Sequence, residues 1–572
     1  MKTFLTIHKT KLLFIALLVV AVGFRFYYLD RLPNAISGDE LLYDITAKSI
    51  ALTGHDITGT WNPFSAFIFR YPPNQQQAEL PYFLLVPFSG LFPFSLLSAK
   101  LPFAILSVGI VILMYAITNS LLGEPFGIAI GFIAAINPWL VVMGRTGYES
   151  TPATFFYLLG IYTLLIKKGR ALYWSLIPFL LAFYSYIGTK LIFVPFVFLA
   201  SYLAYHHHKK QYLKNFIGIS LWSVIIVIGF VLLLKISPTG SRISEIFLPN
   251  SPIVATQVNG MRQNSMQSSM LPVVTNKYSV YLQIITSKLF RIFSPSYLFV
   301  DGDQFFLPVQ QSFFYYVDSI FLLLGFLYLY TKNRRYFFIL CLFALIGTFP
   351  HLFHKTTGDF SGHLALMFPF LIIVIGTGIA SIIQSFRKFS KTIALCIIGF
   401  IYLFSAVNFL VVYFNQTPRI GYADFQMRVL SKYLQLAKRQ KLPIIVYSNT
   451  SADLFKKYLF YTDSMNRSTM PIIRNTDTNN RFTFDKITFS SCENGPAPKD
   501  TIAIYDAICD AHVNEPHDRI ARLSDGGSLY QIVHDKTCMQ YPLNPYPIGV
   551  TMNDFNVNQL SEERFCMIYV AR

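Results

Sequence analysis

The chain has 572 residues, of which 53% are hydrophobic and only 13% are charged, and its formal net charge is +18. Soluble domains carry about 25% charged residues, so this deficit excludes an ordinary soluble protein for most of the chain. The positive charge does not indicate a nucleic-acid partner, because the basic residues lie mainly in short runs between apolar segments. That distribution is typical of a membrane protein whose cytoplasmic loops are positive.

Apolar segments of membrane-spanning length recur along the first two thirds of the chain. We predict about eleven spans, at residues 12–29, 97–118, 125–143, 151–166, 171–187, 190–205, 216–235, 313–331, 336–351, 363–383 and 392–413. The first segment lacks a small-x-small cleavage site and runs into bulky aromatic residues, so we interpret it as an uncleaved span and not as a signal peptide. The fourth to sixth segments are closely spaced, which leaves re-entrant segments as an alternative.

Basic clusters in alternate loops predict the orientation. They comprise Lys167, Lys168 and Arg170; Lys209, Lys210 and Lys214; Lys332, Arg334 and Arg335; and Arg387, Lys388 and Lys391. With about eleven spans these clusters share the cytoplasmic side with the basic N-terminus. The outer face then carries loops 30–96, 144–150, 236–312 and 352–362 and the tail from about residue 414. The predicted location is the cytoplasmic membrane, and a bacterial source is expected.

Two domains are predicted from this pattern. Residues 1–413 would form an all-α polytopic membrane domain with about eleven transmembrane helices, in which 30–96 and 236–312 are the long outer loops. Residues 414–572 would form a small extracytoplasmic α/β domain. Its helical stretch runs from Gln426 to Gln440, and a strand-like run follows from Pro443 to Tyr447.

The cysteines agree with an extracytoplasmic tail. Four of the six lie there: Cys492, Cys509, Cys538 and Cys566. An even number of cysteines in such a domain predicts two disulfides. Sequence order favours Cys492–Cys509 and Cys538–Cys566, although three pairings are possible. A zinc site is the alternative, but no C-x-x-C spacing supports it.

Carboxylates at the outer membrane surface are the candidates for chemistry. Asp39 and Glu40 follow the first span, and the amphipathic pattern of residues 41–52 predicts an interfacial helix lying on the bilayer. Glu149 lies in a very short outer loop that holds it near the membrane surface. The alternatives are structural: Asp39 would cap the helix that follows it, and Glu149 would cap the fourth span.

Three further features on the outer face invite interpretation. Arg145 lies four residues before Glu149 and could pair with it or hold a lipid phosphate. Lys190 begins the sixth span on the same face. The alternative for each cation is snorkelling to head groups. Asp301-Gly302-Asp303 matches the D-x-D pattern of nucleotide-sugar sites, but the outer face holds no nucleotide sugars, so a turn is favoured.

These residues occur in an order that resembles the membrane glycosyltransferases that use polyprenyl-phosphate sugars. That group is GT-C family 39, with the protein O-mannosyltransferases and the aminoarabinose and galacturonic acid transferases of lipid A. The resemblance covers about residues 12–413 and runs through FRFYYLDRLPNAISGDELLYDITAKSIALTGHD, AELPYFLLVPFSGLFPFSLLSAKLPFAILSVGIVILMYAI, GRTGYESTPATFFYLLGIYTLL, SYIGTKLIFVPF and FSPSYLFVDGDQFFLPVQQSFFYYVD. Lys100 and His363 depart from it, because members often carry an Arg at each of these two places.

The resemblance implies a GT-C-like fold and an inverting transfer of a sugar from a polyprenyl-phosphate carrier to a lipid, glycan or protein acceptor. Asp39 would be the catalytic base, while Glu40 and Glu149 would position Asp39 or the acceptor. The expected phosphate-binding residues are Arg70, Arg145, Lys190 and, when protonated, His363. No cofactor is expected, and neither is a divalent metal. The expected partners are a lipid-linked donor, an acceptor and membrane lipids.

Two other classes of function compete with this interpretation. A transporter or flippase of lipid-linked sugars would need polar residues along a path through the spans. The predicted spans are nearly free of Asp, Glu and Lys, and the acids gather at one face, which favours catalysis at the surface. A non-catalytic scaffold that displays the tail is the third possibility.

Overall fold

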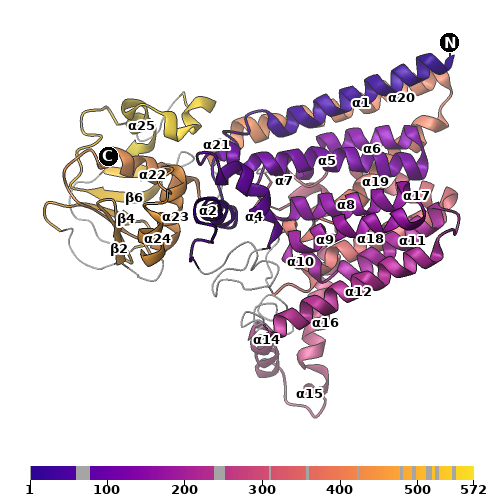
Figure 1. Cartoon of the computed structure of the whole chain (residues 1–572), viewed down its shortest axis with the longest axis horizontal. Coiled ribbons are helices and arrows are strands. Elements are labelled where there is room, and N and C mark those ends of the chain that lie inside the picture. The colour runs from indigo at the N-terminus through magenta and orange to yellow at the C-terminus, as the bar shows by residue number, and fades with distance from the viewer. Residues whose placement is uncertain are drawn as a thin grey trace.

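The computed structural model describes residues 2–59, 78–236, 252–303, 305–307, 311–355, 360–420, 424–476, 481–492, 498–509, 518–521, 527–543 and 549–571. Arg70 lies outside the described residues. A bundle of long helices forms one part of the molecule, and a smaller part built around a β-sheet lies at one end of the bundle (Figure 1). We call these parts the helical bundle and the sheet domain.

Each apolar segment predicted as a span is helical over most of its length. The helices are α1 (Lys2–Phe26), α5 (Leu96–Leu122), α6 (Glu124–Ile136), α7 (Pro138–Met143), α8 (Ser150–Ile166), α9 (Leu176–Ser185), α10 (Ile187–Lys190), α11 (Phe193–His207), α12 (Leu213–Ile236), α17 (Asp318–Lys332), α18 (Arg334–Leu352), α19 (Phe368–Ser385) and α20 (Lys388–Val411). Within the described residues, five helices are long and apolar enough to cross a membrane. The chain is therefore a multi-pass membrane protein, and the total of about eleven spans stays a prediction.

Close approach of small residues holds the centre of the bundle together. A Cβ added at Gly325 of α17 would lie 2.0 Å from the carbonyl oxygen of Val374, and one added at Gly378 of α19 would lie 2.1 Å from that of Phe321. Only glycine fits where two helix backbones come this near, which is the usual way that membrane helices pack closely.

A buried arginine ties α1 to the break between α6 and α7. Pro138 has no N–H group, so the carbonyl of Ala134 cannot make its helical hydrogen bond. Arg25 donates to the carbonyl oxygens of Ala134 at 3.1 Å and Ala135 at 2.9 Å. This side chain is fully buried. Arg25 thus satisfies both carbonyl groups and fixes the C-terminal end of α1. The loop that carries the candidate site follows this end.

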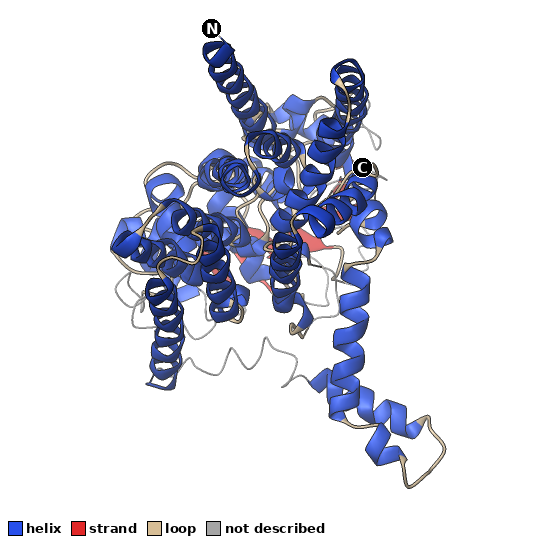
Figure 2. Ribbon diagram, turned by 90° about the vertical axis from the view of Figure 1, so that its right-hand side faces the viewer, coloured by secondary structure: helices blue, strands red, loops and turns tan. Residues whose placement is uncertain are grey.

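The described part of the long loop between α12 and α17 carries three α-helices. They are α14 (Pro252–Gln263), α15 (Leu271–Val274) and α16 (Lys277–Ile292). Together they form an arm that projects from the bundle (Figure 2). The arm is anchored at its base, where Lys288 donates to the carbonyl oxygen of His354 at 2.7 Å.

The sheet domain contains seven strands in the order β2-β3-β1-β4-β6-β5-β7. The strands are β1 (Ile444–Tyr447), β2 (Arg481–Phe484), β3 (Ile487–Ser490), β4 (Ile502–Asp506), β5 (Asp518–Ala521), β6 (Ser528–Val533) and β7 (Val570–Ala571), and the helices are α22 (Phe425–Ala437), α23 (Ser451–Tyr461), α24 (Met470–Thr476) and α25 (Glu562–Tyr569). Strand β1 pairs in parallel with β3 and β4, whereas the other pairs are antiparallel. The predicted α/β character, with a helix followed by a strand, is confirmed by α22 and β1.

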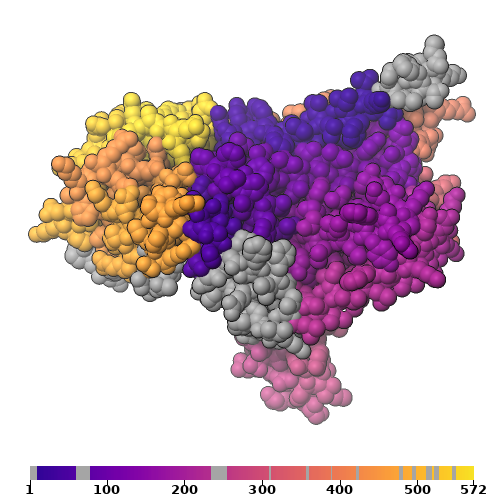
Figure 3. All heavy atoms as spheres, in the orientation of Figure 1, coloured from indigo at the N-terminus to yellow at the C-terminus, as the bar shows by residue number. Residues whose placement is uncertain are grey.

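The predicted interfacial helix is found, but its surroundings differ from the prediction. Helix α2 (Gly38–Thr53) is enclosed by protein on two sides, and most of its residues are buried. Leu41 and Ile45 share an apolar cluster with Leu459 of the sheet domain. Tyr43 packs in a second cluster with Phe103 of the bundle. Figure 3 shows this N-terminal segment, in indigo and purple, in direct contact with the sheet domain. The amphipathic pattern thus reflects burial between two domains.

Both disulfides of the sheet domain have the pairing that sequence order favours, Cys492–Cys509 and Cys538–Cys566. Among the described residues, the free cysteines are Cys341 and Cys396, both in bundle helices. The first bridge joins the chain after β3 to the chain after β4. The second joins α25 to the segment after β6.

The disulfides should contribute strongly to the stability of the sheet domain. Replacing Cys538 and Cys566 together by Ala should lower the free energy of unfolding by about 3 kcal/mol, because the bridge closes a loop and restricts the unfolded chain. Denaturant unfolding of the purified protein measures this difference. Cys396→Ala, at an exposed free cysteine, is the control. An equal midpoint for the double variant and wild type would contradict the expectation.

Candidate functional site

The start of α2 is fixed by two side chains, one of them from the predicted set. Ser37 is the N-cap residue. Its backbone N–H donates to Glu40 Oε2 at 2.8 Å, and its hydroxyl accepts from the N–H of Glu40 at 3.4 Å. This reciprocal pair is a capping box, and it sets where the helix begins.

Glu40 was expected to position Asp39 or the acceptor, and its contacts bear on that expectation. Its side chain is 2% exposed, and its second oxygen accepts from the backbone N–H of Gly147. A carboxylate that uses both oxygens on backbone donors is poorly placed to touch a substrate. Glu40 instead joins α2 to the loop before α8, where Glu149 lies. It is therefore a positioning residue.

Asp39 lies in the first turn of α2, and its side chain reaches solvent. Ser37 and Glu40 cap the helix, so the structure does not assign Asp39 that role. Partial desolvation by the surrounding protein raises the pKa of Asp39, and the negative charges of Glu40 and Asp424 raise it further. A raised pKa makes a carboxylate a stronger base, provided that it remains ionised at the working pH. Because Asp39 is exposed and its pKa is raised, it is the best placed candidate for the base among these carboxylates.

Glu149 occupies the N-cap position of α8, but the contact described for its side chain is with α2. Its Oε2 accepts from the hydroxyl of Tyr43. Burial raises the pKa of Glu149 well above its ordinary value, and the charge of Asp39 adds to that effect. Lys190 acts on it in the opposite direction. These mutual effects place Asp39, Glu149 and Lys190 in one electrostatic neighbourhood.

Lys190 does not snorkel to head groups as the alternative proposed. Its Nζ forms an ion pair with Glu79, at 2.7 Å from Oε1 and 3.0 Å from Oε2. The two side chains are 8% and 4% exposed. The ammonium group also lies 4.5 Å from the ring centroid of Phe230, in cation–π geometry. The pair is therefore held inside the protein beside Glu149.

Two carboxylates of this neighbourhood were missed by the sequence analysis. Glu79 directly precedes helix α4 (Leu80–Leu85), which has a proline in its first turn. A single acidic residue before an apolar helix in the outer loop was the sequence signal that could have identified it. Asp44 lies in α2 among apolar residues. Its side chain is buried, and burial raises its pKa to about 8. It was overlooked because it belongs to the face that was assigned to the membrane surface.

Arg145 was expected to bind a lipid phosphate, and its contacts bear on that expectation. Its guanidinium makes five hydrogen bonds, to Tyr413 Oη and to the carbonyl oxygens of Phe24, Arg25, Tyr28 and Leu32, at 3.1–3.2 Å. An arginine has five N–H donors, so none remains for a lipid phosphate. The side chain is fully buried. Arg145 thus satisfies carbonyl groups at the C-terminal end of α1, where a cation is favourable.

His363 lies in the 3-10 turn η5 (Ser361–Leu364), before α19 begins. Its ring stacks on Tyr186 at 6.2 Å between centroids, and that of His354 lies 4.3 Å away. Its expected role in phosphate binding stays a prediction. Within the described residues its Nδ1 has no hydrogen-bond partner.

The D-x-D sequence was expected to form a turn, but Asp301 ends the π-helix η4 (Tyr297–Asp301), and Gly302 and Asp303 follow it in irregular backbone. Gly302 has φ +63°, a conformation that glycine adopts without strain. Asp303 accepts from the backbone N–H groups of Phe305 at 2.8 Å and Ser361 at 2.7 Å. It thereby anchors the turn that carries His363. In the parts of the chain that the structure describes, no group of three or more His, Cys, Asp or Glu side chains could hold a metal ion.

Comparison with known proteins gives structural likenesses at low identity. No protein-family model matches the chain, and no curated protein matches it. An apo oligosaccharyltransferase from Archaeoglobus fulgidus is similar at 12% identity and TM-score 0.45, over 79% of this chain and 64% of that one. The chain thus spans less than two thirds of that relative.

Two other solved structures are similar. The archaeal oligosaccharyltransferase AglB from Archaeoglobus fulgidus, in complex with an inhibitory peptide and a dolichol-phosphate, has 11% identity and TM-score 0.44, over 88% of this chain and 70% of that one. ArnT from Cupriavidus metallidurans, bound to undecaprenyl phosphate, has 11% identity and TM-score 0.44, over 91% of this chain and 97% of that one. Because the identities and TM-scores are this low, the likenesses do not determine the function of this chain, and its own residues must indicate it.

Proposed function

We propose that the protein is a membrane glycosyltransferase that transfers a sugar from a polyprenyl-phosphate carrier to an acceptor at the outer face of the cytoplasmic membrane. The observation that carries this proposal is the electrostatic neighbourhood of Asp39, Glu149 and the Lys190–Glu79 pair, next to helix α2, which packs against both the bundle and the sheet domain. The sequence resemblance to family 39 supplies the donor class. It also supports a GT-C-like fold with about eleven spans.

The proposed reaction is a direct displacement at the anomeric carbon. Asp39 takes the proton from the acceptor hydroxyl while the acceptor oxygen forms a bond to that carbon. The bond from the carbon to the phosphate oxygen breaks, and its electron pair leaves with polyprenyl phosphate. The configuration at the anomeric carbon is inverted. The raised pKa of Asp39 favours this proton transfer.

Neighbouring groups would assist both ends of the displacement. Glu149, whose raised pKa favours the protonated form, can donate a hydrogen bond to the acceptor or to Asp39. Lys190 lies close enough to Glu149 to act on it, and its cation would stabilise charge that develops on the leaving phosphate. His363 would contact the same phosphate group. Arg70 keeps its predicted role in phosphate binding. No metal is required, because polyprenyl phosphate is already a good leaving group.

The proposed orientation follows from the loop charges and from the disulfides. The sheet domain would lie outside the cytoplasmic membrane, where its two bridges persist. The N-terminus would lie in the cytoplasm. The site would then open toward a lipid-linked sugar whose phosphate lies at the outer membrane surface.

A cell-based experiment separates this proposal from a flippase. Cells lacking the gene should accumulate the lipid-linked sugar in the outer leaflet and lose one glycosylated product, because transfer is blocked after the donor has crossed the membrane. Mass spectrometry measures both, and oxidation of the sugar with membrane-impermeant periodate reports the leaflet. Reintroducing the gene should restore both. Accumulation in the inner leaflet alone would contradict a transferase and indicate a flippase.

A further inference from the structure

The loop that leads into α2, residues 32–37, is held by an unusual set of contacts. Four cationic side chains each donate to one of its carbonyl oxygens: Arg145 Nη2 to Leu32 at 3.2 Å, Lys100 Nζ to Pro33, Arg428 Nη1 to Asn34 at 2.7 Å, and Lys457 Nζ to Ile36 at 2.8 Å. All four side chains are buried. The first two come from the helical bundle, and the last two come from the sheet domain. The loop is therefore fixed from both domains at once.

Helix α23 of the sheet domain contacts both backbone polar groups of Ile36 in this loop. Lys457 donates to the carbonyl oxygen of Ile36, and the hydroxyl of Tyr461 accepts from the N–H of the same residue at 3.0 Å. The next residue, Ser37, is the N-cap of α2, and Asp39 follows two positions later. A displacement of α23 would therefore be transmitted through the backbone of Ile36 to the helix turn that carries Asp39.

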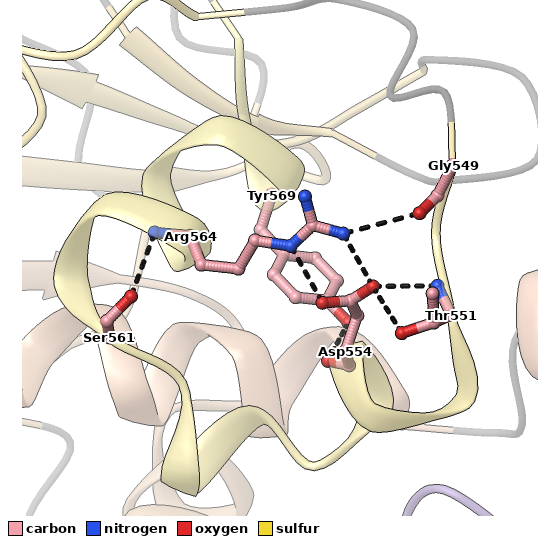
Figure 4. A network of polar contacts seen from close by, with 6 residues as sticks. All are labelled: Gly549, Thr551, Asp554, Ser561, Arg564 and Tyr569. Atoms are coloured by element: carbon pink, nitrogen blue, oxygen red, sulfur yellow. Dashed lines mark hydrogen bonds and ion pairs between the residues drawn. The ribbon is translucent and has the colours of Figure 1, made fainter.

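Helix α22 holds the loop at a second point. Arg428 donates to the carbonyl oxygen of Asn34 and, at 3.3 Å, to the side chain of Asn556. The segment around Asn556 is itself rigidly placed. Arg564 forms two parallel hydrogen bonds of 2.8 Å with the carboxylate of Asp554, and the hydroxyl of Tyr569 donates to the carbonyl oxygen of Asp554 at 2.9 Å (Figure 4). Such a bidentate pair fixes orientation as well as distance.

Stability alone does not account for this arrangement. Removing a lysine or arginine side chain from water is costly, and a carbonyl oxygen compensates only in part. Lys457 is also paired with the carboxylate of Asp424 at 2.5 Å, which offsets its charge. An apolar contact between the domains would hold them together at lower cost. What the buried cations add is a fixed position for each carbonyl group of the loop.

We propose that Lys457 and Arg428 are positioning residues for Asp39, so that the sheet domain forms part of the active site and is not a separate binding module. The inference rests on the proposed role of Asp39 as base. A base must hold its proton-accepting oxygen near the acceptor hydroxyl, and a misplacement of about 1 Å can lower the rate by about 10²-fold. The clamp of four cations supplies that precision to a loop that is otherwise without regular structure.

Asp424 gives the clamp an electrostatic readout. This residue precedes α22, pairs with Lys457 and acts on Asp39 through its negative charge. The other charged groups that face Asp39 are Glu40 of its own helix and Glu149 at the start of α8. Removing the charge of Asp424 should therefore lower the pKa of Asp39.

The test compares matched lysine variants in the purified full chain. Lys457→Met keeps most of the side-chain volume but loses the donor, so kcat should fall by about 10- to 100-fold while the KM for a polyprenyl-phosphate sugar changes less than about twofold. Lys457→Arg keeps a donor and should recover most of the rate. Lys438→Met is the control, because Lys438 pairs with Asp485 within the sheet domain. It should retain wild-type kcat.

A second pair of variants keeps the test decisive if Lys457→Met folds poorly. Lys457→Met combined with Asp424→Asn removes both charges and should fold, and its kcat should still be low. Asp424→Asn alone should shift the acidic limb of the kcat profile to lower pH, and asparagine tolerates the positive φ of 70° at this position. Wild-type kcat in a folded Lys457→Met protein, or an acidic limb that Asp424→Asn leaves in place, would overturn the inference. If Asp39→Asn is also fully active, the proposed function fails instead.

Discussion

Replacing Asp39 by Asn should lower the rate of sugar transfer by about 10² to 10⁴-fold, which is the usual contribution of a general base. Asparagine keeps the shape of the side chain but cannot accept the proton of the acceptor hydroxyl. Donor binding should change little, because the phosphate is held elsewhere. The measurement is the release of free polyprenyl phosphate from a lipid-linked sugar by equal amounts of wild-type and variant protein.

The fold should tolerate this substitution. Ser37 and Glu40 hold the start of α2, so Asp39→Asn removes only a favourable charge in the first helical turn, which is worth less than about 1 kcal/mol at an exposed site. Asp30→Asn is the matched control, because Asp30 is an exposed acid in the same loop. Wild-type turnover in Asp39→Asn would refute the assignment of the base.

The pH dependence of the wild-type enzyme gives an independent check on the same residue. The base must be ionised to act, so activity should fall as pH falls through the pKa of Asp39. Burial, Glu40 and Asp424 raise that pKa, and the acidic limb of kcat should therefore lie above pH 3.8, the ordinary value for Asp. This limb should be missing from the residual activity of Asp39→Asn.

Lys190→Met should destabilise the protein by about 3–5 kcal/mol, the second large effect that we expect. The substitution removes the cation of a buried ion pair and leaves the carboxylate of Glu79 in a site that is closed to water. Stability is measured as the denaturant midpoint of the detergent-solubilised protein. The double variant Lys190→Met with Glu79→Met should recover much of the loss, because no uncompensated charge then remains.

The same variants separate structure from catalysis. If Lys190 also stabilises the leaving phosphate, the double variant should be stable and still transfer sugar more slowly than wild type. Lys167→Met, at an exposed lysine beyond the end of α8, serves as the control and should match wild type in both measurements. A loss of less than about 1 kcal/mol in Lys190→Met would show that the pair is solvated or does not form.

Local patterns in the sequence determined much of the architecture. Long apolar runs must become helices in a membrane, because no water is present there to satisfy their backbone groups. The helix α22, the strand β1 and both disulfides were likewise predictable, since each depends on residues that are close in sequence or on a small set of cysteines. Asp39 was also found from sequence, although only through its resemblance to a family motif.

Contacts between distant residues decided the rest, and a single sequence does not display them. Lys190 meets Glu79 across 111 positions, and Lys457 meets Ile36 across 421. The amphipathic pattern of α2 is the same whether lipid or protein covers its apolar face. Only the tertiary structure showed that the sheet domain buries this face. The sequence likewise does not show that Arg145 donates to backbone carbonyl groups, or that the carboxylate of Glu40 accepts from backbone N–H groups. Charge alone does not reveal whether a side chain holds a substrate or holds the chain.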